Sequence, residues 1–464
     1  LSMLAGDMDA PGTFLNAPAV LERQYAAFCM DCWINDPAVK VPDRMKPVLD
    51  GLSTNKGFPF ELIEFTSTSA KTLFDGFLQL FDNSLDDAAR EYLEKYALGE
   101  GGTGTLALRF AEVFHRVESE RRSLLNRIQR TVRRIRDLET NPARDQNFDE
   151  TMQELKNERW ALERIIKSIN EKDVFNFLTD EGVLPNYAFP EAGVLLRSVI
   201  LKRNTNPAGP SWMTDVYEYE RSASSALGEF APANHFYAGG RRVTIDRVDL
   251  GVSKVEDWRF CPDCPRSEPE VTASEFTECP SCGSAIWSDA GQCRQMLRMA
   301  QVFATSTDKR SQSLDSEDER KTEFYRKHLL VYAEPEDITV AYKIASETLP
   351  FGFEFLSKSY FRDINFGLDN KPGEMIPVAG REVPREGFHV CNSCGQVDVG
   401  GDGTPFKHAI DCQHRHNQTQ GQSLDALYLY REFQSEAIRM LLPVSTLAVE
   451  EKISSFMAAL YLGL

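Results

Sequence analysis

Two groups of cysteines at metal-ligand spacing constrain this chain more than any other feature of its sequence. The first group holds two Cys-x-x-Cys pairs separated by fourteen residues, namely Cys261, Cys264, Cys279 and Cys282. The second group has one such pair and then a histidine and a cysteine, and its members are Cys391, Cys394, His408 and Cys412. Four ligands of this kind at this spacing are typical of a closed tetrahedral zinc site. The sequence therefore predicts two zinc ions, each with a structural role.

Each Cys-x-x-Cys turn, here called a knuckle, aims two sulfur atoms at one point. A glycine follows the second cysteine at Gly283 and Gly395, where it frees the backbone to fold around a metal. Disulfide bonds are the alternative for these cysteines. Two complete ligand sets and the lack of a recognisable signal peptide favour reduced thiols in a cytoplasmic protein. The histidine of the second group stays open among His408, His389, His414 and His416.

The composition is that of an ordinary globular chain, with 42% hydrophobic and 26% charged residues. Its 464 residues suffice for about two to four domains with ample core. No stretch approaches the ~18 apolar residues of a membrane span, so no membrane association is expected. The formal net charge of −18 argues against a protein whose whole surface coats nucleic acid, but it leaves room for a local basic stripe.

The pattern along the chain predicts an α+β protein in three parts. Residues 1–98 show helical periodicity, and the glycine-rich run 99–104 is expected to be a hinge. Residues 99–172 are expected to form a long antiparallel helical hairpin. Residues 173–464 are expected to form a mixed, β-rich domain that carries both zinc sites.

Two details of the helical part can be predicted from local sequence. Ser67 is placed to cap a helix that carries Leu73 and Phe77. Cys29 and Cys32 form another Cys-x-x-Cys pair but have no second pair nearby. They are therefore predicted to be packed thiols of a helix rather than metal ligands.

The first arm of the hairpin is rich in arginine, and the segment 141–145 is expected to break the helix before the second arm. Between Arg116 and Arg136 there are eight arginines and two glutamates, a local charge of +6, so the rest of the chain carries −24. One hypothesis is contact with nucleic-acid phosphates, which the guanidinium fork suits. The other is pairing with glutamates of the second arm, and spacing alone does not choose. The candidate DNA contacts are Arg121, Arg122, Arg127, Arg130, Arg133 and Arg134.

Strand patterns dominate after residue 190. The run 194–202 is rich in β-formers, and residues 338–344 alternate as a half-buried strand would. Segment 236–243 is expected to be a hairpin whose two glycines form the turn. Segment 305–321 is polar and charged, which favours an exposed loop leading into a helix.

The chain lacks the motifs of phosphate-transfer and hydrolytic chemistry. It contains no Gly-Lys-Ser/Thr sequence with which to wrap a nucleotide phosphate. No Ser-His-Asp or Cys-His arrangement stands out, and a closed zinc site has no position for a water nucleophile. No catalytic residue is therefore predicted.

Four segments, in one order, carry a resemblance to a known family. Segment 177–190 contains Leu-Pro-Asn-Tyr-Ala-Phe-Pro, and it is followed by segments 219–232, 388–412 and 429–460. Together they resemble the C-terminal half of superfamily-two DNA helicases that end in a cysteine-rich domain. This family includes the mitomycin-repair helicase MrfA and helicase-associated proteins of the DISARM and Druantia antiphage systems.

The resemblance implies a zinc-stabilised region of an ATP-dependent DNA helicase in bacterial antiphage defence or DNA repair. Its implied partners are DNA, a helicase core in the same polypeptide and a defence-system protein. The apolar run at 456–464 favours a fragment of a longer chain, with residues 1–98 following the helicase core. Two alternatives stay open. One is a protein-interaction scaffold. The other is a His-Asn-His-type nuclease whose metal would be bound by His408, His414 and His416.

Overall fold

The chain was analysed as a computed structural model. The residues it describes are 18–81, 85, 87–99, 104–140, 148–185, 193–203, 212–312, 324–344, 351–369, 373–398, 406, 408–409, 412–415, 424–441, 454–455, 457–459 and 462. The expected hinge is only partly covered, and the expected helix break at 141–145 lies outside these residues.

The chain divides into two compact units, each assembled from three separate stretches. Unit 1 consists of Leu1–Lys254, Met299–Arg320 and Val390–Leu424, and unit 2 consists of Val255–Arg298, Lys321–His389 and Asp425–Leu464. Helices and mixed sheets occur together, which confirms the α+β class. The three-part domain division made from the sequence stays a prediction.

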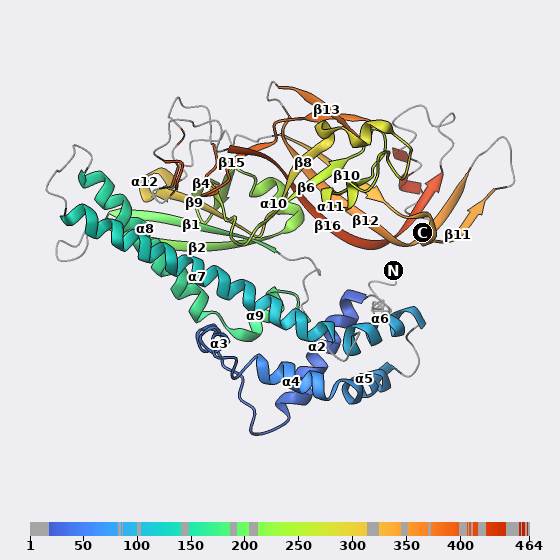
Figure 1. The fold of residues 1–464 in the computed structure, drawn as a ribbon, viewed down its shortest axis with the longest axis horizontal. Coiled ribbons are helices and arrows are strands. Elements are labelled where there is room, and N and C mark those ends of the chain that lie inside the picture. The colour runs from blue at the N-terminus through green and yellow to red at the C-terminus, as the bar shows by residue number, and fades with distance from the viewer. Residues whose placement is uncertain are drawn as a thin grey trace, which may run out of the picture. The chain divides into compact units, whose positions relative to one another are not determined.

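Unit 1 opens with a layer of short helices (Figure 1). They are α2 (Pro18–Ile34), α3 (Met45–Leu52), α4 (Phe60–Thr68), α5 (Ala70–Leu78), η1 (Gln79–Phe81), α6 (Asp87–Leu98) and, later in the chain, α9 (Val174–Asp180). Their apolar side chains enclose one core, in which Tyr25 packs edge-on against Phe77 with 5.3 Å between ring centroids. Cys29 is fully buried in this core and Cys32 packs against it, as expected of packed thiols.

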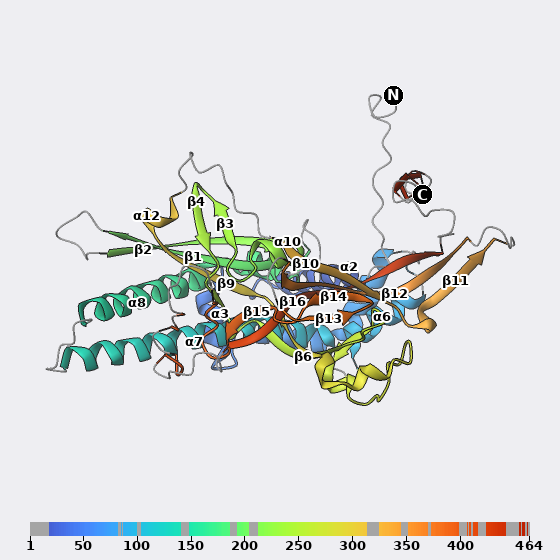
Figure 2. The same cartoon turned by 90° about the horizontal axis from the view of Figure 1, so that it is seen from above.

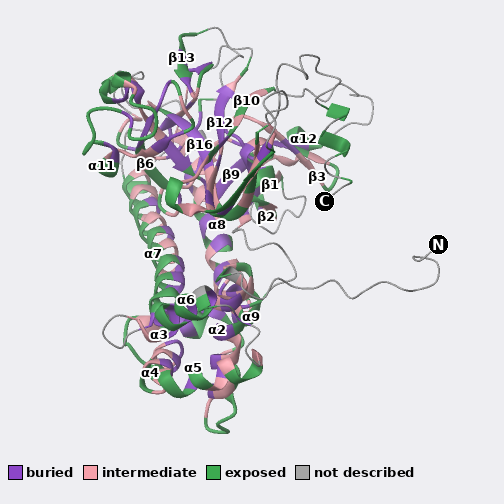
Figure 3. Ribbon diagram, turned by 90° about the vertical axis from the view of Figure 1, so that its right-hand side faces the viewer, coloured by how far each residue is buried: buried purple, intermediate pink, exposed green. Residues whose placement is uncertain are grey.

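The two predicted arms are α7 (Thr105–Thr140) and α8 (Phe148–Glu171), which run side by side in two views (Figures 1 and 2). Buried residues recur along α7 at three- and four-residue steps, which leaves the opposite face exposed (Figure 3). The buried series includes Phe110, Phe114, Val117 and Leu124. No helix in the described part of the chain is long and apolar enough to cross a membrane.

The sheet of unit 1 has the strand order β2-β1-β9-β5. Its strands are β1 (Gly193–Arg203), β2 (Trp212–Ser222), β5 (Arg247–Val248) and β9 (Gln301–Thr307). β1 pairs antiparallel with β2 over its whole length and parallel with β9. The strand predicted at 194–202 is therefore confirmed as β1.

A small hairpin and two short helices complete unit 1. β3 (His235–Ala238) and β4 (Arg241–Thr244) pair antiparallel, and Gly239 and Gly240 between them have φ of 57° and 69°. Two consecutive positive φ values define the type I′ turn that fits strand twist, so the predicted hairpin is confirmed. The short helices are α10 (Ala223–Glu229) and α12 (Asp308–Ser311).

Unit 2 is built on a large mixed sheet with the order β10-β12-β16-β8-β6-β7, in which β11 also pairs with β12 and β15 with β16. The strands are β6 (Lys254–Phe260), β7 (Ser267–Pro269), β8 (Cys293–Arg298), β10 (Tyr325–Tyr332), β11 (Ile338–Lys343), β12 (Gly352–Leu368), β16 (Leu424–Leu441) and β15 (Phe388–Cys391), whose last two residues are assigned to unit 1. A separate hairpin joins β13 (Met375–Val378) to β14 (Arg381–Pro384). Short turns of helix are α11 (Glu270–Ala273), η2 (Ala285–Ser288), η3 (Ala290–Gln292) and η4 (Pro335–Asp337). Aromatic residues fill the core, and Phe366 lies 4.9 Å from Tyr428 between ring centroids.

One local prediction was wrong, and two others were wrong in part. Ser67 caps no helix, because its hydroxyl donates to Ile63 O within α4. The strand predicted at 338–344 forms as β11 over 338–343, but all of its residues after the first are exposed rather than alternating. Of the loop expected at 305–321, residues 305–307 instead continue β9, where Thr305 N also donates to Asp246, and α12 follows directly, while 313–321 lie outside the described residues.

Candidate metal centres

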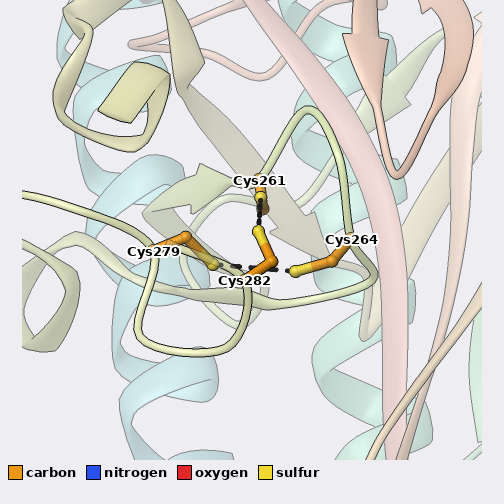
Figure 4. Close-up of side chains that lie close together, drawn as sticks. All are labelled: Cys261, Cys264, Cys279 and Cys282. Carbon is orange, nitrogen blue, oxygen red and sulfur yellow. Dashed lines mark hydrogen bonds between the residues drawn. The ribbon is translucent and has the colours of Figure 1, made fainter. Parts of the chain in front are cut away.

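The first cysteine group lies in two knuckles of unit 2, one directly after β6 and one before η2 (Figure 4). Cys261 Sγ lies 3.5 Å from Cys282 Sγ, and Cys264 Sγ lies 3.6 Å from Cys279 Sγ. All ten cysteines are free. The disulfide alternative is therefore wrong for this group, because bonded sulfurs lie about 2.05 Å apart.

These distances agree with a zinc ion at the centre of the four sulfurs. Sulfur atoms about 2.3 Å from a tetrahedral zinc are about 3.8 Å from each other. The ligand atoms of each group all lie within 4.8 Å of one another. Each group can thus hold one zinc ion with four protein ligands, in agreement with the two ions predicted.

A buried tryptophan packs against the first ligand group. Trp287 is fully buried, and its indole nitrogen donates to Ala273 O at 3.2 Å. Arg259 donates to Trp287 O at 2.7 Å and is paired with Glu270. Trp287 packs with Cys261 and Cys279 in a small separate core. This core is too small to be stable without a metal, so a zinc ion bound there has a structural role.

The second group lies in unit 1 and combines three sulfurs with one imidazole. Cys391 Sγ lies 3.8 Å from Cys412 Sγ, and His408 Nδ1 lies 3.8 Å from Cys394 Sγ and 3.6 Å from Cys412 Sγ. A sulfur and a nitrogen on the same tetrahedral zinc are about 3.6 Å apart. Burial lowers the pKa of His408, and the neighbouring His414 lowers it further. Both effects favour the neutral imidazole that binds a metal.

The structure also places the three other histidines that the sequence left open. The ring of His414 lies 5.9 Å from that of His408 and contributes no ligand atom to the group. His389 belongs to unit 2, and His416 lies outside the described residues. Among the described residues, the set brought together is Cys391, Cys394, His408 and Cys412.

Two of the knuckles share one pattern of backbone hydrogen bonds. Gly283 N donates to Cys279 O at 2.8 Å, and Gly395 N donates to Cys391 O at 2.9 Å. Both glycines adopt positive φ, 74° and 70° respectively. The glycine that the sequence pattern requires is thus used for left-handed backbone in both places.

Only the second of these knuckles packs its glycine against another strand. Val248 N of β5 donates to Gly395 O, and Val397 N donates to Asp246 O, each at 2.8 Å. The knuckle therefore extends the edge of the unit 1 sheet beyond β5. Burial raises the pKa of Asp246 to about 6, although the amide of Thr305 donates to its carboxylate and opposes the shift.

We expect Gly395→Ala to be far more damaging than Gly283→Ala. Left-handed backbone costs alanine about 1–2 kcal/mol in both knuckles. A Cβ at Gly283 meets nothing within 4 Å, whereas a Cβ at Gly395 would lie 1.9 Å from Val248 O. The second knuckle must therefore leave β5. Thermal melts and zinc content of the two variants test this, and equal melting temperatures would contradict it.

The six candidate DNA contacts on α7 fall into two sets. Arg121 donates to Asp50 at 2.6 Å and Arg127 donates to Glu158 of α8 at 2.7 Å, and both are largely buried. Arg127 thus pairs with a glutamate of the second arm, as the charge-pairing hypothesis expects, whereas Arg121 pairs with Asp50 of α3. Arg122, Arg130 and Arg133 are exposed. Arg134 is half-buried, so three of the six are exposed.

Two arginines that are placed at important contacts in the structure were not identified from the sequence. Arg197 of β1 is buried between two glutamates, and Arg247 of β5 is half-buried beside the second knuckle. Arg197 stands among apolar residues of a long strand, whereas Arg247 lies in a two-residue strand between Asp246 and Val248. A charged residue in an apolar run is the signal that could have marked Arg197 for a paired or ligand-binding role.

Comparison with known proteins gives one distant similarity. The Druantia protein DruE of Escherichia coli (strain UMEA 4076-1) is 23% identical over 271 residues, which cover 54% of this chain and 13% of DruE. The chain thus corresponds to a small part of the length of that relative. No protein-family model and no solved structure matches the chain.

Proposed function

We propose that this chain is the zinc-stabilised, DNA-binding region of an ATP-dependent DNA helicase of bacterial antiphage defence. The similarity to DruE supports the defence context. The two closed ligand groups support a structural rather than a catalytic use of zinc. The main observation in support of DNA binding is the charge on the exposed face of α7.

That face carries positive charge in an otherwise acidic protein. Arg122, Arg133 and Arg136 are exposed and project from one side of the helix, and Arg130 is exposed next to them. From Arg122 to Arg136 the helix rises about 21 Å, enough to follow several phosphates of a strand. The net charge of −18 repels DNA elsewhere, so binding is local and depends strongly on salt.

Replacing Arg122, Arg130 and Arg133 together by glutamine is expected to weaken DNA binding for every sequence alike. If all three contact phosphates, the slope of log affinity against log salt should fall by about 2–3. Fluorescence anisotropy of a labelled oligonucleotide, titrated at several salt concentrations, measures both quantities.

The matched control removes the same charge from other exposed positions of unit 1. Lys71, Arg90 and Lys95 are exposed on α5 and α6. Their replacement by glutamine should leave the salt slope unchanged. An equal loss in both triple variants would mean that net charge alone governs binding, and the α7 face would then lose its role.

A further inference from the structure

A cavity of about 310 Å³ lies within unit 1, where three elements meet. Ser123, Arg127 and Arg130 line it from α7, Arg247 and Asp249 from β5 and the turn after it, and Ser393 from the second knuckle. The cavity therefore brings together the arginine helix and one zinc group, the two features that the sequence singled out.

Arg247 is the cavity's unusual group. Its guanidinium lies 4.0 Å from the ring centroid of Phe303, which holds one face of the side chain. Within the described part of the chain it makes no hydrogen bond and no ion pair. A half-buried guanidinium has five N–H groups that need acceptors. None of them is a buried atom without a partner, so they are open to the cavity and available to a ligand with several acceptor atoms.

The other charged groups around the cavity are mostly engaged in structural contacts. Asp249 accepts from Gln301 at 3.1 Å and from Gly251 N at 3.0 Å, so both carboxylate oxygens are occupied. Arg127 is held by Glu158, and Arg130 is exposed. Three arginines and one aspartate line the cavity, Asp246 and Glu158 also act on Arg247, and a zinc with three thiolates and one imidazole adds one negative charge.

The surroundings of Arg247 disfavour its charge. Burial lowers the pKa of Arg247 below the usual arginine value and Arg127 lowers it further by repulsion, although Asp249, Asp246 and Glu158 partly oppose the shift. An anion in the cavity would relieve both effects. Guanidinium donors and serine hydroxyls arriving from three elements match a tetrahedral oxyanion better than a planar carboxylate.

We propose that this cavity binds a phosphate group. The phosphate bound during function is one of the DNA backbone. The second knuckle and α7 would then hold one nucleotide in a fixed position. This source of the phosphate rests on the proposed function. Free phosphate offers the same chemistry and provides an independent test.

The experiment measures binding of inorganic phosphate by the whole chain, using ³¹P line broadening and calorimetry. Arg247→Met removes the central donors and keeps the apolar contact with Phe303. Ser123→Glu places a carboxylate at the mouth of the cavity from an exposed helical position. Ser119→Glu, also exposed on α7 but outside the cavity, is the matched control.

We expect both Arg247→Met and Ser123→Glu to weaken phosphate binding at least about tenfold, whereas Ser119→Glu leaves it within about twofold. If Arg247→Met does not fold, Ser123→Glu decides. No phosphate binding by the unmodified chain, or equal binding by all variants, overturns the proposal. Phosphate binding that depends on Arg247 in a chain that does not bind DNA would support the cavity and refute DNA as its source.

Discussion

Purified protein is expected to contain two zinc ions per chain, and loss of one ligand from either group should leave one. Cys264→Ser removes a ligand of the first group and Cys394→Ser one of the second. The remaining three ligands hold zinc weakly, and the knuckle loses the constraint that closes it. We expect a loss of about 4 kcal/mol or more in the free energy of unfolding, since the loss of a structural metal is among the most damaging single changes.

Cys293→Ser is the matched control for these variants. Cys293 is a half-buried thiol at the start of β8 in unit 2, and it belongs to neither ligand group. This variant should keep two zinc ions and nearly the original melting temperature. Elemental analysis that finds less than one zinc per unmodified chain would contradict the prediction.

The two zinc ions should also differ in how fast a chelator removes them. Cys282 of the first group is exposed, whereas the ligands of the second group are buried or half-buried. A chelator can reach the first ion directly through Cys282, whereas the more buried ligands of the second group give it less access. Zinc release followed with a colorimetric chelator should therefore have two phases, and Cys264→Ser should remove the faster one.

Arg197→Met is expected to destabilise the protein by about 3–5 kcal/mol, because it leaves buried glutamate without its partner. Arg197 Nη1 lies 2.6 Å from Glu120 of α7, and its Nε lies 3.0 Å from Glu218 of β2. The Arg197 side chain is 4% exposed and that of Glu120 is 12% exposed. Burial opposes the charge on Arg197, yet the two glutamates outweigh burial and raise its pKa.

Two comparisons make this prediction specific to burial. Arg159→Met breaks an exposed pair with Glu163, 2.7 Å apart on α8, and should cost less than about 1 kcal/mol. The double variant Arg197→Met, Glu120→Met removes both charges and should regain part of the loss. Urea denaturation gives all three values. Equal losses of unfolding free energy for Arg197→Met and Arg159→Met would contradict the prediction. They would show that the buried ion pair between β1 and α7 stabilises the fold no more than an exposed pair does.

The sequence predicted those parts of the fold that depend on local spacing. The zinc ligands follow from the interval between cysteines, α7 and α8 from helical periodicity, and the β3–β4 turn from two adjacent glycines. Contacts between residues far apart in the sequence leave no pattern in the local sequence, so they were not predicted. The pattern Cys-x-x-Cys-Gly is the same at Gly283 and Gly395, yet only Gly395 meets another strand. Arg247 and Arg197 likewise acquire their roles from residues far away in the sequence.

The order in which the ribosome delivers the chain matters for unit 1. Its sheet needs β9, which comes after residue 299, and its zinc ligands come only from 391 to 412. The helices and β1 are therefore synthesised long before the sheet edge at β5 can be covered by the second knuckle. At about 5–20 residues per second, this interval lasts several seconds or more. During that time β5 is an open strand edge that can pair with the wrong strand. Folding of the second knuckle around its zinc ion covers this edge and completes unit 1.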